Sequence, residues 1–558
     1  MRISTTVLIA TWLATGAVTA QRRPLAEPHI ADITTLVLLE DRRDFNADVL
    51  TRILGSDHPE VRRRAAQSIA RINDPRGRAL LHSARSDADT SVAATAVFGI
   101  GQLRDSAAVP LLDSLLSARR TPVTVAFEAA RALGKIRTPE SREVLAKYLL
   151  SATEASQPKS VIGEALLSMG RQTTRGSSIP IARFTNSKDE EIRWRATWAL
   201  FRPRDPVAAS ELLRLSSDAS GHVRSWAIRA LGAATVDSAR IDRNQALLAL
   251  IGAARRDSDR RVRTEAIRTM IAYDDSASFA ELVTALNNPD TWISVSAAEA
   301  LARRTSRSDQ AIAALTRATA ADRPSALRIV AVQSLLALSA ESARAPGELL
   351  ATDSLPLSRQ TATTVANRLA QAANPPARGG GAGRGGGGGR GRGQQRPLDT
   401  GRTEADYRRI VERWVLPAYN GAERPRARWD FAKGSIELEL YAGDAPLAVE
   451  DFMKLHESGA IVGAEFSRVV PDFVVQQRGI YNDHTLRDEI TRLGLTRANL
   501  SWASSGLDTG RPGYTLGHTP QPHNEGDFTT LGRVVRGIDV VDRLDLGDRI
   551  VAARIISR

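Results

Sequence analysis

From about residue 30 to residue 370, apolar residues recur at a spacing typical of helices. Each unit has an apolar residue, a small residue four positions on and a second apolar residue four further on. Nine such units follow one another at intervals of 31 to 39 residues, starting at Val61, Val92, Val125, Val161, Ile192, Val223, Val262, Ile293 and Leu327. Positions i, i+4 and i+8 share one helix face. The pattern therefore predicts an all-α solenoid of stacked helix pairs over 30–370.

Residues 371–400 break this pattern with the run AANPPARGGGAGRGGGGGRGRGQQRP. A segment of this composition cannot form a packed core, so we expect a disordered linker rich in glycine and arginine. Arginine–glycine segments bind nucleic acid in other proteins, usually with interleaved aromatic side chains. Aromatic residues are missing from this run. The sequence therefore argues against nucleic acid as a partner.

Residues 401–558 change to a pattern typical of strands after a short predicted helix over 405–415. The run ARWDFAKGSIELELY contains two alternating stretches separated by Lys433-Gly434, which predicts a hairpin. A helix is expected over Ala448–Ser458. Further strands are expected over Glu465–Val470, Phe473–Gln477, Thr529–Val535 and Ile550–Ile556.

The first 20 residues have the features of a secretory signal. Arg2 precedes a mostly apolar stretch from Val7 to Ala14, and small residues stand at Val18 and Ala20. The apolar stretch is shorter than the ~20 residues that a membrane-spanning helix needs, so cleavage after Ala20 is favoured over a retained anchor. We expect an exported protein, periplasmic or secreted.

Composition limits the chemistry more than it identifies a partner. The chain has no cysteine, which excludes disulfides, thiolate metal sites and cysteine nucleophiles. Its formal net charge is +13, and part of this excess lies in the arginine–glycine run. Net charge alone does not identify a ligand.

Two resemblances add to this picture. The unit starts HPEVRRRAAQSIARI and SGHVRSWAIRALGA resemble bacterial HEAT-like repeats. The run GSIELELYAGDAPLAVEDFMKLHESGAIVGAEFSRVVPDFVVQ resembles the first half of cyclophilins, and TLGHTPQPHNEGDFTTLGRVVRGIDVVDRL resembles their closing segment. The second resemblance extends from Arg428 to Leu544. Together they imply a multidomain chain: an all-α HEAT-like solenoid plus a C-terminal cyclophilin-like antiparallel β-barrel.

The cyclophilin resemblance implies catalysis of rotation about the peptide bond before proline. This reaction has a barrier of ~18–20 kcal/mol and needs no metal or cofactor. By resemblance, Arg468 is the catalytic residue that donates to the prolyl nitrogen, and Gln476 holds a substrate carbonyl. The same comparison places substrate-binding side chains at Phe466, Phe473, Val474, Tyr514, Thr515, His523, Asn524 and Phe528. The expected ligands are proline-containing peptides or client proteins, with a further protein partner on the solenoid.

Several site positions depart from the family pattern. Ser467 stands where histidine is usual, and Gly513 and Thr515 replace a glutamine and a phenylalanine. Asn524 stands where leucine is usual. Each lost apolar wall removes about 1.5–3 kcal/mol of contact. The sequence thus leaves two functions open: a peptidyl-prolyl isomerase and folding factor, or a non-catalytic binding scaffold with a degenerate barrel. A metal site at His518 and His523 is disfavoured, because loop histidines are usually solvated.

Overall fold

The structure is a computed structural model that describes most of the chain. The described residues are 23–172, 178–203, 205, 208–232, 236–237, 240–373, 398–477, 480, 486–504, 506–511 and 513–557. The predicted signal and most of the predicted linker lie outside them. Within these residues, none of the helices has both the length and the apolar character to cross a bilayer.

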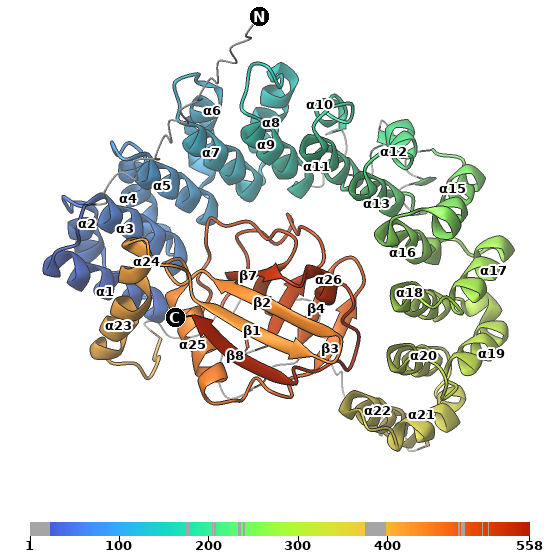
Figure 1. Ribbon diagram of the computed structural model, residues 1–558. Coiled ribbons are helices and arrows are strands. Elements are labelled where there is room, and N and C mark those ends of the chain that lie inside the picture. Colours follow the sequence, from blue (N-terminus) through green and yellow to red (C-terminus); the bar gives the residue numbers. More distant parts are fainter. Residues whose placement is uncertain are drawn as a thin grey trace, which may run out of the picture.

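The first part of the chain is a solenoid of helix pairs that curves around a barrel (Figure 1). It begins with α1 (Glu27–Arg42) and ends with α22 (Pro356–Ala373). The inner helices are α3 (Pro59–Ile72), α5 (Thr90–Gln102), α7 (Val123–Ile136), α9 (Lys159–Arg171), α11 (Glu190–Phe201), α13 (Gly221–Ala230), α16 (Arg260–Thr269), α18 (Thr291–Leu301) and α20 (Ser325–Leu338). The outer helices are α2 (Ala47–Leu54), α4 (Arg78–Ala84), α6 (Val109–Ser117), α8 (Pro139–Ser151), α10 (Ser178–Ala182), α12 (Ala209–Leu215), α15 (Arg243–Arg256), α17 (Ser276–Ala285), α19 (Ser308–Ala318) and α21 (Arg344–Ala351).

The nine predicted units coincide with the nine inner helices, which confirms the helical-repeat prediction. Of the three apolar or small positions in each unit, none is more than 3% exposed. Glycines that follow several units allow neighbouring inner helices to approach closely. A Cβ on Gly101 would lie 2.7 Å from Cα of Ala132, and one on Gly134 would lie 2.8 Å from Cα of Ser168. Any larger side chain there would push the two repeats apart.

Ion pairs join successive repeats at a recurring position. The residue after the first apolar position of a unit is often an arginine, and it pairs with an aspartate of the following repeat. The distances are 2.7 Å for Arg62–Asp87, 3.1 Å for Arg193–Asp218, 2.7 Å for Arg224–Asp257 and 3.3 Å for Arg328–Asp353. Because these side chains are only partly exposed, the pairs are less screened by salt than surface pairs.

The C-terminal part is an eight-stranded antiparallel sheet that curls on itself. Its strands are β1 (Arg426–Phe431), β2 (Gly434–Leu440), β3 (Phe466–Val470), β4 (Val474–Gln477), β5 (Asn499–Trp502), β6 (Tyr514–Gly517), β7 (Thr530–Arg536) and β8 (Ala552–Ser557), in the order β3-β4-β6-β5-β7-β2-β1-β8. The two edges meet beside β3, where Phe466 N donates to Asp548 O at 2.9 Å and Glu465 bridges Arg549. The antiparallel barrel predicted from the sequence is confirmed. Helices α25 (Pro446–Glu457) and α26 (Ile538–Val541) complete it.

A short helical segment links the barrel to the first repeat. It consists of α23 (Glu404–Ile410), the π-helical η7 (Val411–Val415) and α24 (Leu416–Tyr419). Tyr407 donates its hydroxyl to Asp41 of α1 at 3.0 Å, and Arg402 pairs with the same carboxylate at 2.7 Å. This segment therefore packs on the solenoid as well as on the barrel.

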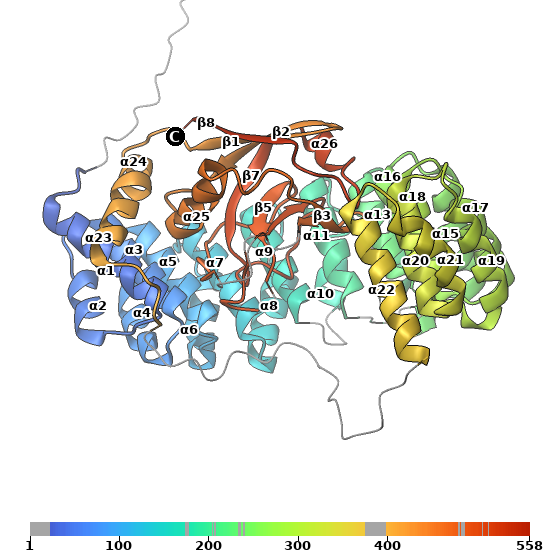
Figure 2. The same ribbon diagram turned by 90° about the horizontal axis from the view of Figure 1, so that it is seen from below.

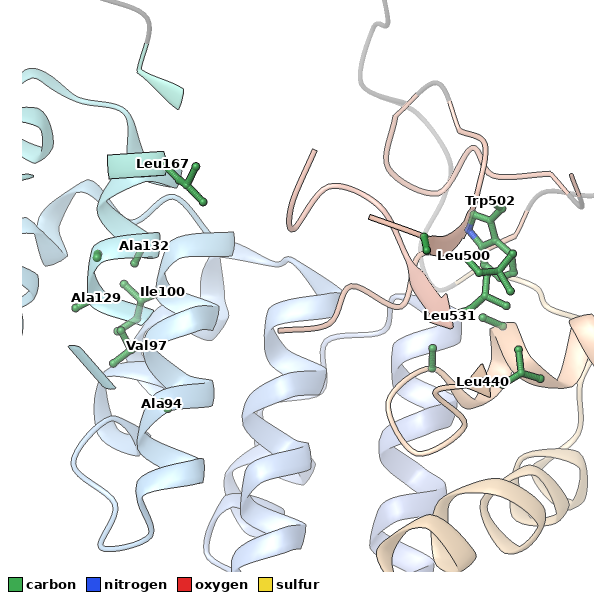
Figure 3. Close-up of a cluster of buried hydrophobic side chains, with 14 of the residues drawn as sticks. Ala94, Val97, Ile100, Ala129, Ala132, Leu167, Leu440, Leu500, Trp502 and Leu531 are labelled. Atoms are coloured by element: carbon green, nitrogen blue, oxygen red, sulfur yellow. The ribbon is translucent and has the colours of Figure 1, made fainter. Parts of the chain in front are cut away.

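The barrel lies against the concave face of the solenoid (Figures 1 and 2). One continuous apolar cluster extends from the first repeats into the barrel interior. Figure 3 shows parts of it, with Ile100 and Ala132 between inner helices and Leu500 and Leu531 inside the barrel. Arginines of the inner helices donate to loop carbonyls of the barrel: Arg71 Nε to Ile490 O at 3.0 Å, Arg131 Nη1 to Arg492 O at 2.9 Å, Arg171 Nε to Pro522 O at 2.8 Å, Arg260 Nη1 to Asp542 O at 2.6 Å and Arg268 Nη1 to Pro471 O at 2.7 Å.

A buried carboxyl group lies where the barrel meets α3. Glu489 is 1% exposed, and its Oε2 accepts from Ala448 N at 2.7 Å. Burial raises the pKa of Glu489 to about 8, although Arg71 opposes this shift. The folded protein therefore holds a proton that the unfolded chain releases at lower pH. The resulting stability is complete below the ordinary pKa of 4.5 and is lost as the pH rises through about 8.

We expect the melting temperature to fall between about pH 6.5 and pH 8 and the Glu489→Gln variant to remove most of that fall. Glutamine imitates the protonated carboxyl and can still accept from Ala448 N. The window begins above the pKa values of about 6 of the buried Asp472 and Asp488 and ends where Lys135 begins to titrate at about 8. It also lies above the pKa values of the buried histidines, which are lowered to about 4 at His456, His518 and His523. Thermal unfolding at several pH values, with the exposed Glu348→Gln as control, checks this. An unchanged slope in Glu489→Gln would contradict it.

Candidate active site

Three of the predicted site residues lie side by side across neighbouring strands. Arg468 of β3 is opposite Gln476 of β4, and Gln476 is opposite Thr515 of β6. Arg468 Nη1 donates to Gln476 Oε1 at 3.1 Å. A glutamine oxygen beside the guanidinium fixes one of its nitrogens and leaves the others able to donate. The row is thus a donor platform on the outer face of the sheet.

An aromatic wall stands next to this platform. The ring of Phe473 stacks on that of His523 with centroids 5.8 Å apart and planes 23° apart. The guanidinium carbon of Arg468 lies 5.9 Å from the Phe473 centroid. Burial and nearby Arg202 lower the pKa of His523 to about 4, so the imidazole is neutral at neutral pH. The wall therefore offers two uncharged ring faces beside a cation.

The solenoid holds the turn that carries Phe473. Asp472 has φ +53°, and its buried Oδ2 accepts from Ser225 Oγ of α13 at 2.8 Å. Arg268 of α16 donates to the carbonyl of Pro471 at 2.7 Å. Burial, together with nearby Glu265, raises the pKa of Asp472 to about 6. Two repeats of the solenoid therefore fix the position of the aromatic wall.

Charges from the solenoid also act on Arg468. Its side chain is exposed, yet partial burial and nearby Arg268 lower its pKa, while Glu299 of α18 opposes this. Burial raises the pKa of Glu299 itself, and Arg268 and Arg468 counteract that shift. Arg468 of the barrel and Glu299 of the solenoid therefore lie close enough for their charges to interact. Neither Arg268 nor Glu299 is indicated by the sequence, because no local pattern reports a contact across 169 or more residues.

The other predicted residues fall into two groups. Val474, which is 3% exposed, adjoins the platform by strand register, and Thr515 within the platform is itself 8% exposed. Asn524 lies in the loop after His523, where its Nδ2 donates to Gln521 Oε1 at 2.9 Å, and Phe528 ends that loop half-buried.

Phe466 and Tyr514 are not part of the site. Phe466 is fully buried against Phe431, with centroids 5.9 Å apart. The Tyr514 ring lies inside the barrel, 5.2 Å from Phe452. Successive strand residues point to opposite sides of a sheet. With Thr515 on the outer face, Tyr514 must face the core.

The two loop histidines considered for a metal site do not lie together. His518 is fully buried against Trp292 of α18, with centroids 4.5 Å apart, whereas His523 stacks on Phe473. In the described part of the chain, histidine, aspartate and glutamate side chains form no group of three suited to a metal ion.

Fold and site together define a helical-repeat protein that encloses a barrel with an arginine–glutamine pair on its surface. The family model described as cyclophilin type peptidyl-prolyl cis-trans isomerase/CLD matches residues 428–556. The model described as HEAT repeats matches 77–166, 147–232, 177–270 and 247–336.

Two sequence relatives agree with the first of these matches. A peptidyl-prolyl cis-trans isomerase of Synechococcus elongatus is 34% identical over 133 residues, which are 22% of this chain and 92% of the relative. Peptidyl-prolyl cis-trans isomerase B of Bacillus subtilis is 34% identical over 128 residues, 22% of this chain and 90% of the relative. A solved cyclophilin type isomerase from Cryptosporidium parvum aligns with a TM-score of 0.23 and 19% identity, covering 24% of this chain and 99% of that one. The chain belongs to the cyclophilin-type peptidyl-prolyl isomerase family through its barrel, which HEAT repeats precede.

Proposed function

We propose that the chain catalyses cis–trans isomerisation of the bonds before proline in exported polypeptides and so assists their folding. The observation that carries this is the pairing of Arg468 with Gln476 beside the Phe473–His523 wall. A catalyst of this reaction needs a surface for the proline ring and donors that favour the twisted bond. Both are present within one sheet and its adjoining loop.

The mechanism rests on a change at the prolyl nitrogen. In a planar peptide its lone pair is shared with the carbonyl, and rotation removes this conjugation. The nitrogen then becomes a better hydrogen-bond acceptor, so a guanidinium N–H directed at it binds the twisted state more tightly than the planar one. Gln476 orients the Arg468 guanidinium for this role. No covalent bond is formed or broken.

The apolar contact for the proline ring comes from fewer walls than the family pattern has. Phe473 and the neutral ring of His523 supply two, and Val474 adjoins them. Thr515 contributes a hydroxyl where a larger ring is usual. We infer that the site binds the proline ring through stacking on Phe473 and His523 and gives it less apolar contact at Thr515.

We expect the full mature chain to accelerate isomerisation of short Xaa-Pro peptides above the uncatalysed rate of one event per tens to hundreds of seconds. Exchange spectroscopy by NMR measures both directions without a coupling enzyme. The chain should also speed the refolding of a test protein whose slow step is proline isomerisation. Proline peptides that bind without any gain in rate would overturn the proposal and leave a binding scaffold.

We expect the chain recovered from an exporting cell to begin at Gln21, because the predicted signal ends at Ala20. N-terminal sequencing of the protein in the exported and cytoplasmic fractions checks this. A chain that keeps its first 20 residues and remains inside the cell would contradict the proposed location.

A further inference from the structure

A row of arginines follows the ends of consecutive inner helices. Arg104 comes two residues after α5, Arg137 is the C-terminal cap of α7, and Arg202 is the C-terminal cap of α11. Arg171, the last residue of α9, occupies the same place in the repeat between the last two. A cation suits the partly negative end of a helix, which accounts for one arginine at each end. It does not account for the way their charges are balanced.

Two cations of these helix ends are matched by the barrel. Arg171 Nη2 contacts Glu525 Oε2 at 2.6 Å, and Lys135 Nζ contacts Asp527 Oδ1 at 2.9 Å. Both acids lie in the loop 522–528, which also carries His523, Asn524 and Phe528 of the site. A Cβ on Gly526, whose φ is +73°, would lie 2.6 Å from Gln102 Nε2 and 2.8 Å from Lys135 Cε. The loop is therefore seated directly on the helix ends.

Three cations of the row make no close ion pair. Among the described residues, Arg104, Arg137 and Arg202 have no carboxylate within ion-pair distance, although the charge of Asp527 acts on Arg137 from further away. Arg202 only donates to Gly170 O at 3.4 Å and lies over the Trp198 ring at 5.5 Å. Burial lowers the pKa of Arg202, and nearby Arg137 lowers it further. The pKa of Arg137 is lowered in the same way by burial and then by Arg104, and Asp527 only partly opposes this.

These three arginines lead to the isomerase site. Of the charges acting on His523, whose ring forms the aromatic wall with Phe473, that of Arg202 has the largest effect on its pKa. Packed helices lie about 8–10 Å apart, so the three steps from α5 to α11 span roughly 24–30 Å. An extended polypeptide rises about 3.3 Å per residue and would cover this distance with about eight residues.

We propose that Arg104, Arg137 and Arg202 bind an acidic segment of the substrate polypeptide and thereby direct prolines flanked by aspartate or glutamate to Arg468. This inference rests on the proposed isomerase function and adds its substrate class. Carboxylates supply the missing counter-charges, and guanidinium groups bind carboxylates through paired N–H donors. A polypeptide fits better than a nucleic acid, because the row ends at the aromatic wall that receives proline.

The test compares peptides with the same central Xaa-Pro bond. Two carry eight-residue flanks rich in aspartate and glutamate, one before and one after the proline, and two carry asparagine and glutamine at the same positions. We expect one acidic peptide to have a kcat/KM about tenfold above that of its neutral counterpart at low salt, since three ion pairs at exposed or half-exposed arginines combine to about that factor. The gain should come from a lower KM for the acidic peptide, and it should decline with added salt.

Variants of the full mature chain locate the effect. The triple variant Arg104→Gln/Arg137→Gln/Arg202→Gln should lose the preference and keep the rate on neutral peptides. The control Arg119→Gln/Arg120→Gln/Arg317→Gln removes three exposed arginines elsewhere and should keep the preference. Equal rates on acidic and neutral peptides, or a preference that survives in the triple variant, would overturn the inference.

A failure of the proposed isomerase function gives a different result. In that case no peptide is turned over, and fluorescence anisotropy of the labelled acidic peptides still tests the row. Weaker binding in the triple variant but not in the control would support the row without catalysis. A single-stranded oligonucleotide that binds the row more tightly than the acidic peptides at about 0.15 M salt would overturn the choice of a polypeptide.

Discussion

Replacing Arg71 with alanine is expected to lower the free energy of unfolding by about 3–5 kcal/mol, the cost of leaving buried charges unpaired. Arg71 is 4% exposed and connects three parts of the molecule. Its Nη1 pairs with Glu40 of α1 at 2.7 Å and lies 3.8 Å from Glu489, its Nε donates to Ile490 O, and its Nη2 donates to Asp444 O. Alanine would leave two buried carboxyl groups and two loop carbonyls without this donor.

Urea denaturation and amide hydrogen exchange measure this effect. Exchange should increase first at Ile490, because the loop that carries it loses its attachment to α3. The matched control is Arg344→Ala, whose arginine also pairs with a glutamate at 2.8 Å but is exposed on α21. That variant should change the free energy of unfolding by about 0–1 kcal/mol. Similar values for the two variants would show that the barrel is not held by Arg71.

Replacing Arg468 with alanine is expected to lower kcat/KM for a proline peptide by about 10²–10³-fold, the usual effect of removing one transition-state donor. The loss should appear in kcat, because the guanidinium acts on the twisted bond more than on the planar one. Arg468→Lys keeps the charge but not the planar guanidinium that Gln476 orients, so its kcat/KM should lie between those of the parent chain and Arg468→Ala.

The stability of these variants should be close to that of the parent chain. Arg468 is exposed and contacts Gln476 and the Phe473 ring. Arg533→Ala is a suitable control, since Arg533 is an exposed arginine on β7 of the same barrel and pairs with Glu439 at 3.3 Å. Full activity in Arg468→Ala would remove this residue from the mechanism, whereas an equal loss in Arg533→Ala would point to general damage.

The helical part could be predicted from sequence because its information is local. An apolar residue, a small residue and a second apolar residue at i, i+4 and i+8 fix which helix face is buried. Val61, Ala65 and Ile69 all prove to be fully buried. The signal for the hairpin of β1 and β2 is equally local, since it consists of two alternating stretches on either side of Lys433-Gly434. The four-residue strands β5 and β6 were not predicted, since alternation over four positions barely differs from a loop.

The site was predicted only in part. Family resemblance located Arg468, Gln476 and Phe473, which the structure brings together. The same resemblance placed Phe466 and Tyr514 there, but both lie in the barrel core. Strand alternation would have separated Tyr514 from Thr515, because adjacent residues cannot face the same side.

The docking of barrel and solenoid had no signal in the sequence. Arg71, Arg171 and Arg268 resemble ordinary cations near helix ends, and their acceptors are backbone carbonyls, which every residue has. Donor and acceptor are separated by 203 to 419 positions. A pattern that repeats every 31 to 39 residues cannot specify such contacts.

The attachment of the segment before the barrel to α1 turns the solenoid into a closed loop of chain. Ala373 ends the last helix, and Leu398 N already donates to Arg42 O beside the first repeat. The 24 residues between them therefore connect the two ends of the solenoid. A trans polypeptide of this length reaches roughly 85 Å at full extension. As long as Leu398 stays on the first repeat, the two ends of the solenoid cannot move further apart than this reach. The 24 residues therefore limit how far the superhelix can open.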